Sequence, residues 1–176
     1  MSIVSIGAFI EGWSLVIPKE HTYSMRSFYV QKDFLTFVSC VAQHIKTTYK
    51  KSIIVFEHGA NRCDSATSCG THHAHLHIVP YDKSLLSTIT EDRDWIRVSY
   101  DQIQEVVGEE EYLLYADLNE SLETSEIYVH ILVKEESQYF RRILAKDANI
   151  PDYSYKTAPC INNTTKSYET LKGYDS

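Results

Sequence analysis

His73-Ala74-His75-Leu76-His77-Ile78-Val79 is the stretch of sequence that decides the fold of this chain. Its three histidines alternate with apolar residues at a strict period of two. In an extended strand, successive side chains point to opposite faces, so the apolar residues would enter a core while the three imidazoles line the other face. A helix would scatter the histidines around its axis. The sequence therefore predicts a β-strand that carries a row of histidines.

The segments on either side of this strand predict both strands and helices. Apolar spacing after Asp33, a candidate cap, predicts a helix to about Tyr49 with one buried stripe. That stripe comprises Phe34, Phe37, Val38, Val41 and Ile45. Further strands are expected over 3–10, 13–17, 52–56, 112–118 and 126–133, and further helices over 100–107 and 135–148. A polar loop over 60–71, rich in small residues, leads directly into the histidine strand.

Composition limits the function classes that fit this chain. It has 176 residues, a net charge of -7 and 43% hydrophobic residues, which is ordinary for a globular protein. The acidic balance argues against a broad grip on nucleic acid, although a local pocket could still bind one nucleotide. No apolar run approaches the roughly 20 residues of a membrane helix, and the N-terminus lacks signal-peptide features. We therefore expect a cytoplasmic protein without a membrane partner.

A metal site is one interpretation of the histidine row. Alternate residues on a strand lie about 6.6 Å apart, so the first and third imidazoles start about 13 Å apart. Zinc needs nitrogens within about 2.1 Å, so three histidines on a straight strand would hardly converge on one ion. Outside ligands would be required, and Cys40, Cys63, Cys69 and Cys160 form no C-x-x-C pair. A half-exposed strand that happens to carry histidine is the other non-catalytic interpretation.

Nucleophilic catalysis on phosphorus is a third interpretation. A neutral imidazole attacks well when a hydrogen-bond acceptor holds its other ring nitrogen and so fixes the tautomer. Flanking imidazoles can contact phosphate oxygens, and small residues nearby let backbone N–H groups approach a phosphate. The histidine strand and the loop before it contain all of these elements.

The stretch His73 to Val79 resembles the His-φ-His-φ-His-φ-φ signature of the histidine triad (HIT) superfamily of nucleotide hydrolases and transferases. Glu11-Gly12 followed by an apolar strand and Pro18-Lys19-Glu20-His21 is similar to another family segment. Ile53 to Gly59 resembles the strand before the family's active-site loop, and the segment after Ser137 resembles a bacterial C-terminal extension. The match covers residues 3–82 well and 136–160 more loosely.

The resemblance implies an α+β fold of HIT type, with an antiparallel sheet of about five strands and packed helices. It implies one domain over residues 1–150, followed by a C-terminal arm over 151–176 that is extended or partly disordered. His75 would be the nucleophile that attacks the α-phosphorus, His77 would contact the phosphate or scissile oxygen, and His73 would orient the site. The implied nucleotide- and phosphate-binding residues are Ser68, Cys69, Gly70, Thr71, Glu57, Ser5, Phe9 and Ile10.

The resemblance implies no cofactor, although Mg²⁺ could travel with a polyphosphate substrate, and many relatives are homodimers. Three positions depart from the family pattern: Trp13 replaces a usual histidine, Glu57 stands where relatives often carry an amide, and Ser5 falls where some members place an asparagine. These departures keep open a binding module with little or no catalysis, beside a metal-dependent hydrolase and a nucleic-acid repair role.

Four other residues have interpretations that do not involve the site. His58 fits a turn residue beside Gly59, and His130 fits a sheet histidine whose hydrogen bonds are satisfied. Arg141 and Arg142 could reach a phosphate, but a solvated helix face is the preferred interpretation for both.

Overall fold

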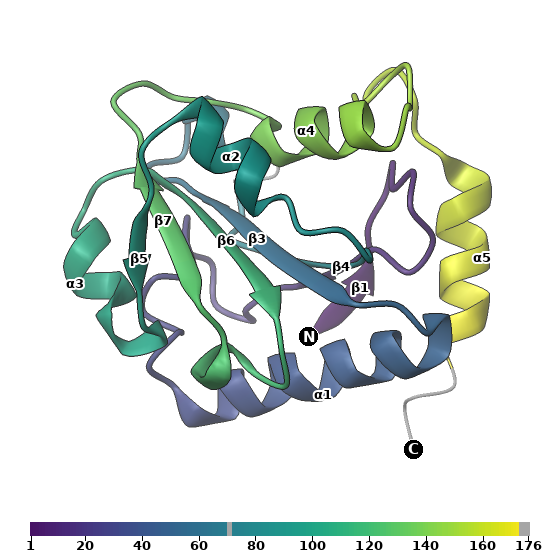
Figure 1. Cartoon of the computed structure of the whole chain (residues 1–176), viewed down its shortest axis with the longest axis horizontal. Coiled ribbons are helices and arrows are strands. Elements are labelled where there is room, and N and C mark those ends of the chain that lie inside the picture. The colour runs from purple at the N-terminus through teal and green to yellow at the C-terminus, as the bar shows by residue number, and fades with distance from the viewer. Residues whose placement is uncertain (70–71, 173–176) are drawn as a thin grey trace.

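A seven-stranded antiparallel sheet is the centre of the computed structural model, which describes residues 1–69 and 72–172 (Figure 1). The strands are β1 (Ser2–Val4), β2 (Ser14–Val16), β3 (Ile53–Gly59), β4 (Leu76–Pro80), β5 (Ile96–Val98), β6 (Tyr112–Leu118) and β7 (Ile127–Ile131). The helices are α1 (Lys32–Tyr49), α2 (Leu86–Asp92), α3 (Ile103–Val107), α4 (Tyr139–Asp147) and α5 (Ile161–Leu171), and three short 3₁₀ turns complete the list. The sheet order is β1-β2-β4-β3-β6-β7-β5, which places β4 and β3 side by side near its middle.

The α+β class agrees with the sequence, but the sheet has seven strands where about five were expected. Strand β5 was missed because only three residues pair there, in a segment without clear periodicity. Strand β3 continues through Gly59, past the end at residue 56 that the apolar run predicts, and its bounds match the strand that the resemblance implies. Helix α4 begins at Tyr139, four residues later than the expected start at 135.

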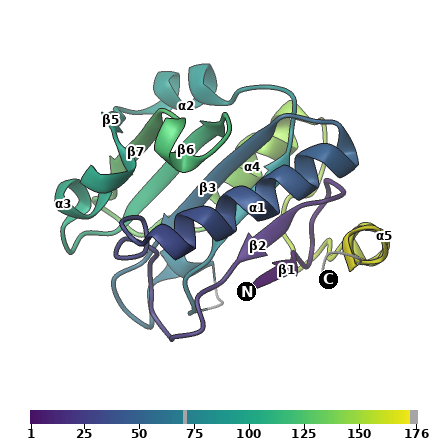
Figure 2. The same ribbon diagram turned by 90° about the horizontal axis from the view of Figure 1, so that it is seen from below.

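Helix α1 lies across one face of the sheet (Figure 2). Its buried residues are Leu35, Val38, Val41, Ala42 and Ile45, so the helical period is confirmed but the stripe is displaced. Phe37 is 38% exposed, contrary to the prediction, because the buried face of the helix includes Leu35 and Ala42 and not Phe37. Asp33 lies in the first turn; the N-cap is Gln31, whose side chain makes no capping hydrogen bond.

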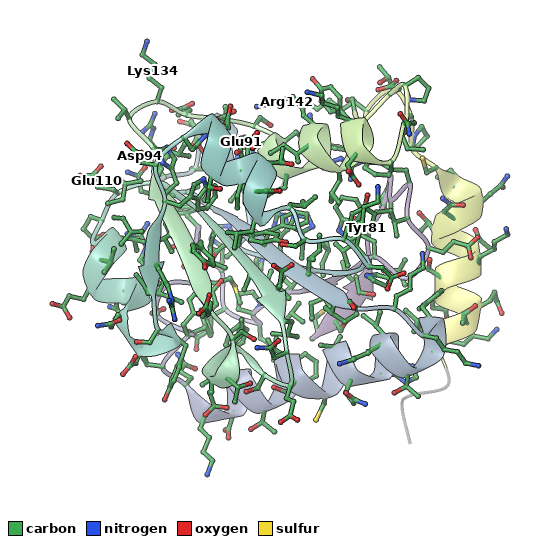
Figure 3. The ribbon with its side chains drawn as sticks, in the orientation of Figure 1. Tyr81, Glu91, Asp94, Glu110, Lys134 and Arg142 are labelled. Atoms are coloured by element: carbon green, nitrogen blue, oxygen red, sulfur yellow. The ribbon has the colours of Figure 1, made fainter. Side chains whose placement is uncertain are left out.

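The opposite face of the sheet is covered by α2, α4 and the segment around residues 8–13 (Figure 1). Trp13, Phe56 and Phe140 are completely buried there and belong to one apolar cluster. Tyr81, labelled in Figure 3, follows β4 directly. Its hydroxyl donates to Asp147 in α4. This bond fixes the last turn of α4 beside the central strands.

The chain beyond residue 150, where the sequence predicts an extended or partly disordered arm, contains helix α5. Helix α5 packs beside β1 and the end of α1 (Figure 2). The Gly12 N–H donates to the buried Ser167 hydroxyl at 2.8 Å, and Lys166 pairs with Glu11. Within residues 1–69 and 72–172, no helix has the length and apolar character needed to cross a membrane.

Candidate active site

The histidine row lies at the start of β4, on the face covered by α4. Only His77 falls inside the paired strand, because β4 begins at Leu76 and not at His73. The alternation still holds: Leu76 and Ile78 belong to the core beneath α1, while the His77 ring stacks on Phe56 on the other face, with centroids 4.4 Å apart. Side-chain direction was therefore predicted correctly, although the strand is shorter than expected.

His75 has the hydrogen bond that a nucleophilic imidazole needs. Its Nδ1 lies 2.9 Å from the His73 carbonyl oxygen. Because a carbonyl can only accept, Nδ1 carries the proton and the lone pair of the neutral ring lies on Nε2. Burial lowers the pKa of His75 to about 4, and the nearby His58 and His73 rings act in the same direction. His75 is therefore neutral near pH 7.

His77 has the opposite tautomer, and Trp13 sets it. The Trp13 indole N–H lies 2.9 Å from Nδ1 of His77, in a buried contact. An indole nitrogen can only donate, so Nδ1 accepts and the proton of the neutral ring is on Nε2. Burial lowers the pKa of His77 well below its usual value, and His75, His58 and Arg141 add to that effect.

His73 bonds through its own ring to a different segment of the chain. Its Nε2 donates to the Pro18 carbonyl at 3.1 Å, and its ring meets His21 edge-on with centroids 5.2 Å apart. Its contribution to the site is its backbone carbonyl, which orients His75.

His58 is the site residue whose position the sequence interpretation missed. It lies inside β3 and not in a turn. Phe56 pairs with His77 in the β3–β4 register, so continuing the register by two residues places His58 opposite His75. His58 is 5% exposed, and neither ring nitrogen has a hydrogen-bond partner among residues 1–69 and 72–172. Burial lowers its pKa to about 4, so the ring is neutral. Alternation from Phe56 along a longer strand would have revealed this position.

Glu57 does not line the histidine face, which corrects its assignment as a nucleotide-binding residue. It follows Phe56 in β3, so strand alternation turns it to the α1 side, where it is completely buried. Its carboxylate accepts from the Met25 N–H at 2.6 Å and from the hydroxyls of Tyr29 and Tyr112 at 2.7 and 2.8 Å. Burial raises the pKa of Glu57, and these three hydrogen bonds oppose that rise.

The loop before the histidines forms a hydrogen-bonded turn at the positions that the structure describes. The N–H groups of Ser68 and Cys69 donate to Ser65 and Ala66 carbonyls at 3.3 and 3.2 Å, inside a 3₁₀ turn. In this conformation those two N–H groups are engaged within the turn and not offered to a phosphate, contrary to expectation. Gly70 and Thr71, the other two predicted phosphate-binding residues, lie outside the described residues.

The other predicted contacts come from the segment between β1 and β2. Phe9 and Ile10 are half-buried and pack against the apolar cluster that contains Trp13. Ser5 is buried, and its hydroxyl donates to the neighbouring Ile6 carbonyl at 3.4 Å. The structure therefore places Phe9 beside the Trp13–His77 pair, with ring centroids of Phe9 and Trp13 5.4 Å apart.

Arg141 is buried, so the interpretation as a solvated helix face is wrong for this residue. Its guanidinium donates to the Gly7 carbonyl at 2.5 Å and to the Tyr153 carbonyl at 2.8 Å. It also lies over the rings of Phe9 and Trp13, 5.3 and 5.0 Å from their centroids. Arg142 is half-buried and pairs with Glu136.

The chain after α4 contacts two segments that flank the site. The Tyr155 hydroxyl donates to the Cys69 carbonyl at 2.7 Å, and the Tyr155 backbone lies so close to Gly7 that a Cβ there would clash. His75 and His77 are only 8% and 6% exposed. A cavity of about 360 Å³ opens elsewhere, between β1, α1 and α5.

Among residues 1–69 and 72–172, no three His, Cys, Asp or Glu side chains are placed so that they could hold one metal ion. No protein-family model matches the chain, and no curated protein sequence matches it. The geometry of the histidine row, taken with the sequence pattern, is therefore the basis for a functional proposal.

Proposed function

We propose that this protein is a nucleotide hydrolase or nucleotidyltransferase of HIT type, in which His75 attacks the α-phosphorus of a nucleotide. The observation that carries the proposal is the 2.9 Å hydrogen bond from His75 Nδ1 to the His73 carbonyl. It directs the Nε2 lone pair away from the backbone, and burial keeps the ring neutral. Both are requirements of an imidazole nucleophile.

The first half-reaction transfers the nucleotidyl group to the protein. His75 Nε2 forms a bond to phosphorus while the bond from phosphorus to the leaving group breaks, and the leaving group takes the electron pair. The resulting ring is cationic, with its proton still on Nδ1, where the His73 carbonyl stabilises it. The Nε2–H of His77 donates a hydrogen bond to the oxygen that gains negative charge.

The second half-reaction releases the nucleotide. Water, or another hydroxyl acceptor, attacks phosphorus and the bond to His75 Nε2 breaks, which restores the neutral imidazole. The acceptor's proton passes to solvent or to a phosphate oxygen. Two displacements predict net retention of configuration at phosphorus.

Substrate entry requires the surroundings of His75 to move, because the nucleophile is less than a tenth exposed. The Tyr155 contact with Cys69 joins the C-terminal segment to the loop before the histidines, and breaking it would loosen that loop. The N–H groups of Ser68 and Cys69 could reach a phosphate only if their hydrogen bonds within the 3₁₀ turn also open. The half-buried apolar residues Phe9 and Ile10 would then hold the base.

The direct test is trapping of the covalent intermediate with an α-³²P-labelled dinucleoside polyphosphate. Acid-labile label on the wild-type protein, and its loss in His75→Asn, would support the proposal. His130→Asn is the matched control, because His130 lies on β7 with its Nδ1 bound to the Asp94 carbonyl. Turnover by His75→Asn at the wild-type rate would refute it, and nucleotide binding without turnover by the wild type would favour the binding module.

A further inference from the structure

We infer that Trp13 is a positioning residue that keeps His77 a neutral hydrogen-bond donor, and that the protein therefore cleaves phosphoanhydrides in preference to phosphoramidates. This inference rests on the proposed function and adds the chemical class of the leaving group. It begins with the buried 2.9 Å hydrogen bond from the Trp13 indole to His77 Nδ1.

That hydrogen bond excludes the protonated form of His77. An imidazolium carries hydrogens on both nitrogens, so its Nδ1–H would face the Trp13 N–H, and the two donors would repel. Trp13 is completely buried, with Phe9 on one edge and Phe56 on another, at centroid distances of 5.4 and 5.7 Å. The indole therefore cannot turn away without repacking the apolar cluster.

The charges around His77 act in the same direction. The titratable groups that influence its ring are His75 on the same strand, His58 on β3 and Arg141 on α4, and each opposes a positive charge. The carboxylate of Glu57 on β3 lies on the other face of the sheet, where it accepts three hydrogen bonds. No carboxylate is among the groups that influence the pKa of His77.

The consequence for catalysis depends on the leaving group. A neutral imidazole can donate a hydrogen bond through Nε2–H, but giving up that proton would create an unstable imidazolate. Phosphate and diphosphate leave as stable oxyanions, so hydrogen bonding is sufficient for a phosphoanhydride. An amine must be protonated on nitrogen before the bond from phosphorus breaks, and this site supplies no general acid at His77.

The test compares diadenosine triphosphate with an adenosine phosphoramidate on the full chain at about pH 7. General acid catalysis typically contributes at least about 100-fold, so we expect kcat/KM for the anhydride to exceed that for the phosphoramidate by about 100-fold or more. Trp13→Phe removes the indole donor. The ratio of kcat/KM for the anhydride to kcat/KM for the phosphoramidate should then fall at least about tenfold, and kcat/KM for the phosphoramidate should rise as the pH is lowered. Trp95→Phe is the matched control, since the Trp95 indole donates at 2.9 Å to the Ile89 carbonyl and should leave the ratio as it is.

The ¹⁵N NMR spectrum of the wild-type protein gives a readout that depends on neither turnover nor the folding of a variant. We expect His77 to show an unprotonated Nδ1 and a protonated Nε2 down to at least pH 5.5. An imidazolium at His77 near pH 6 would overturn the inference. The inference would also be overturned if kcat/KM for the phosphoramidate were within tenfold of that for the anhydride while His75→Asn is inactive. That result would leave the proposed function intact. Absence of turnover on both substrates would refute the proposed function and the inference with it.

Discussion

Replacing His58 by Phe should make this protein more stable. Both His58 ring nitrogens are buried between the rings of Phe56, Phe140 and His77, without a hydrogen-bond partner in the part of the chain that the structure describes. In the unfolded chain both nitrogens bond to water, so folding costs about 1–3 kcal/mol for each. Phenylalanine has no such cost, but its larger ring would cost about 1–3 kcal/mol if the surroundings cannot adjust. The expected net gain in the free energy of unfolding is about 2 kcal/mol.

The gain should increase as the solution is made more acidic. The folded protein holds the pKa of His58 at about 4, against 6.5 for an ordinary histidine. Between these pH values the unfolded chain binds more protons, so wild-type stability falls as pH falls. The full difference corresponds to about 3 kcal/mol, at about 1.4 kcal/mol per pH unit. His58→Phe removes this one contribution, so its advantage over the wild type should grow between pH 6.5 and about pH 4.

Urea unfolding at several pH values between 7 and 4.5 measures both effects, and thermal melts should show a shift of about 4–8 °C near pH 7. His130→Phe is the control, because its Nδ1 is bonded to the Asp94 carbonyl at 2.7 Å and the variant should be no more stable than the wild type. Loss of more than about 1 kcal/mol in His58→Phe, with the pH dependence unchanged, would mean that the buried nitrogens have a partner, and would refute the reasoning.

Three other outcomes follow from the geometry. Glu57→Leu leaves three buried donors without an acceptor and should lower the free energy of unfolding, measured with urea, by about 3 kcal/mol or more. Glu57→Gln should lower it clearly less, and equal losses in the two variants would contradict this account. Tyr155→Phe removes the hydrogen bond to Cys69, which is worth about 1 kcal/mol. It should raise kcat/KM for a dinucleoside polyphosphate by up to about fivefold. A decrease in kcat/KM would show that the contact does not restrict substrate entry. Because the pKa of His75 is lowered to about 4, kcat/KM should stay level from pH 7.5 down to about 5.5, and a fall centred near 6.5 would show an ordinary histidine.

The sequence was informative wherever the signal was local. The period of two in His73 to Val79 fixed which side chains face the core, since backbone geometry alone alternates them. The period of α1 and the strands β6 and β7 were also predictable from local patterns, because α1 buries one stripe and β6 is a nearly continuous buried run. The partner of His75 Nδ1, the His73 carbonyl, is only two residues away in the sequence, so this contact is also local.

Tertiary structure decided the residues that surround the histidines. The pairing of β3 with β4 places His58 beside His75. The fold also brings Trp13 to His77, although these two residues are 64 positions apart in the sequence. The same pairing turned Glu57 to the other face, and the C-terminal segment buried Arg141. Periodicity within one segment cannot report these contacts, because register and coverage depend on which distant segments pack together. The sequence therefore determined where the imidazoles point, and only the folded chain determined their tautomers, their charge and their access to solvent.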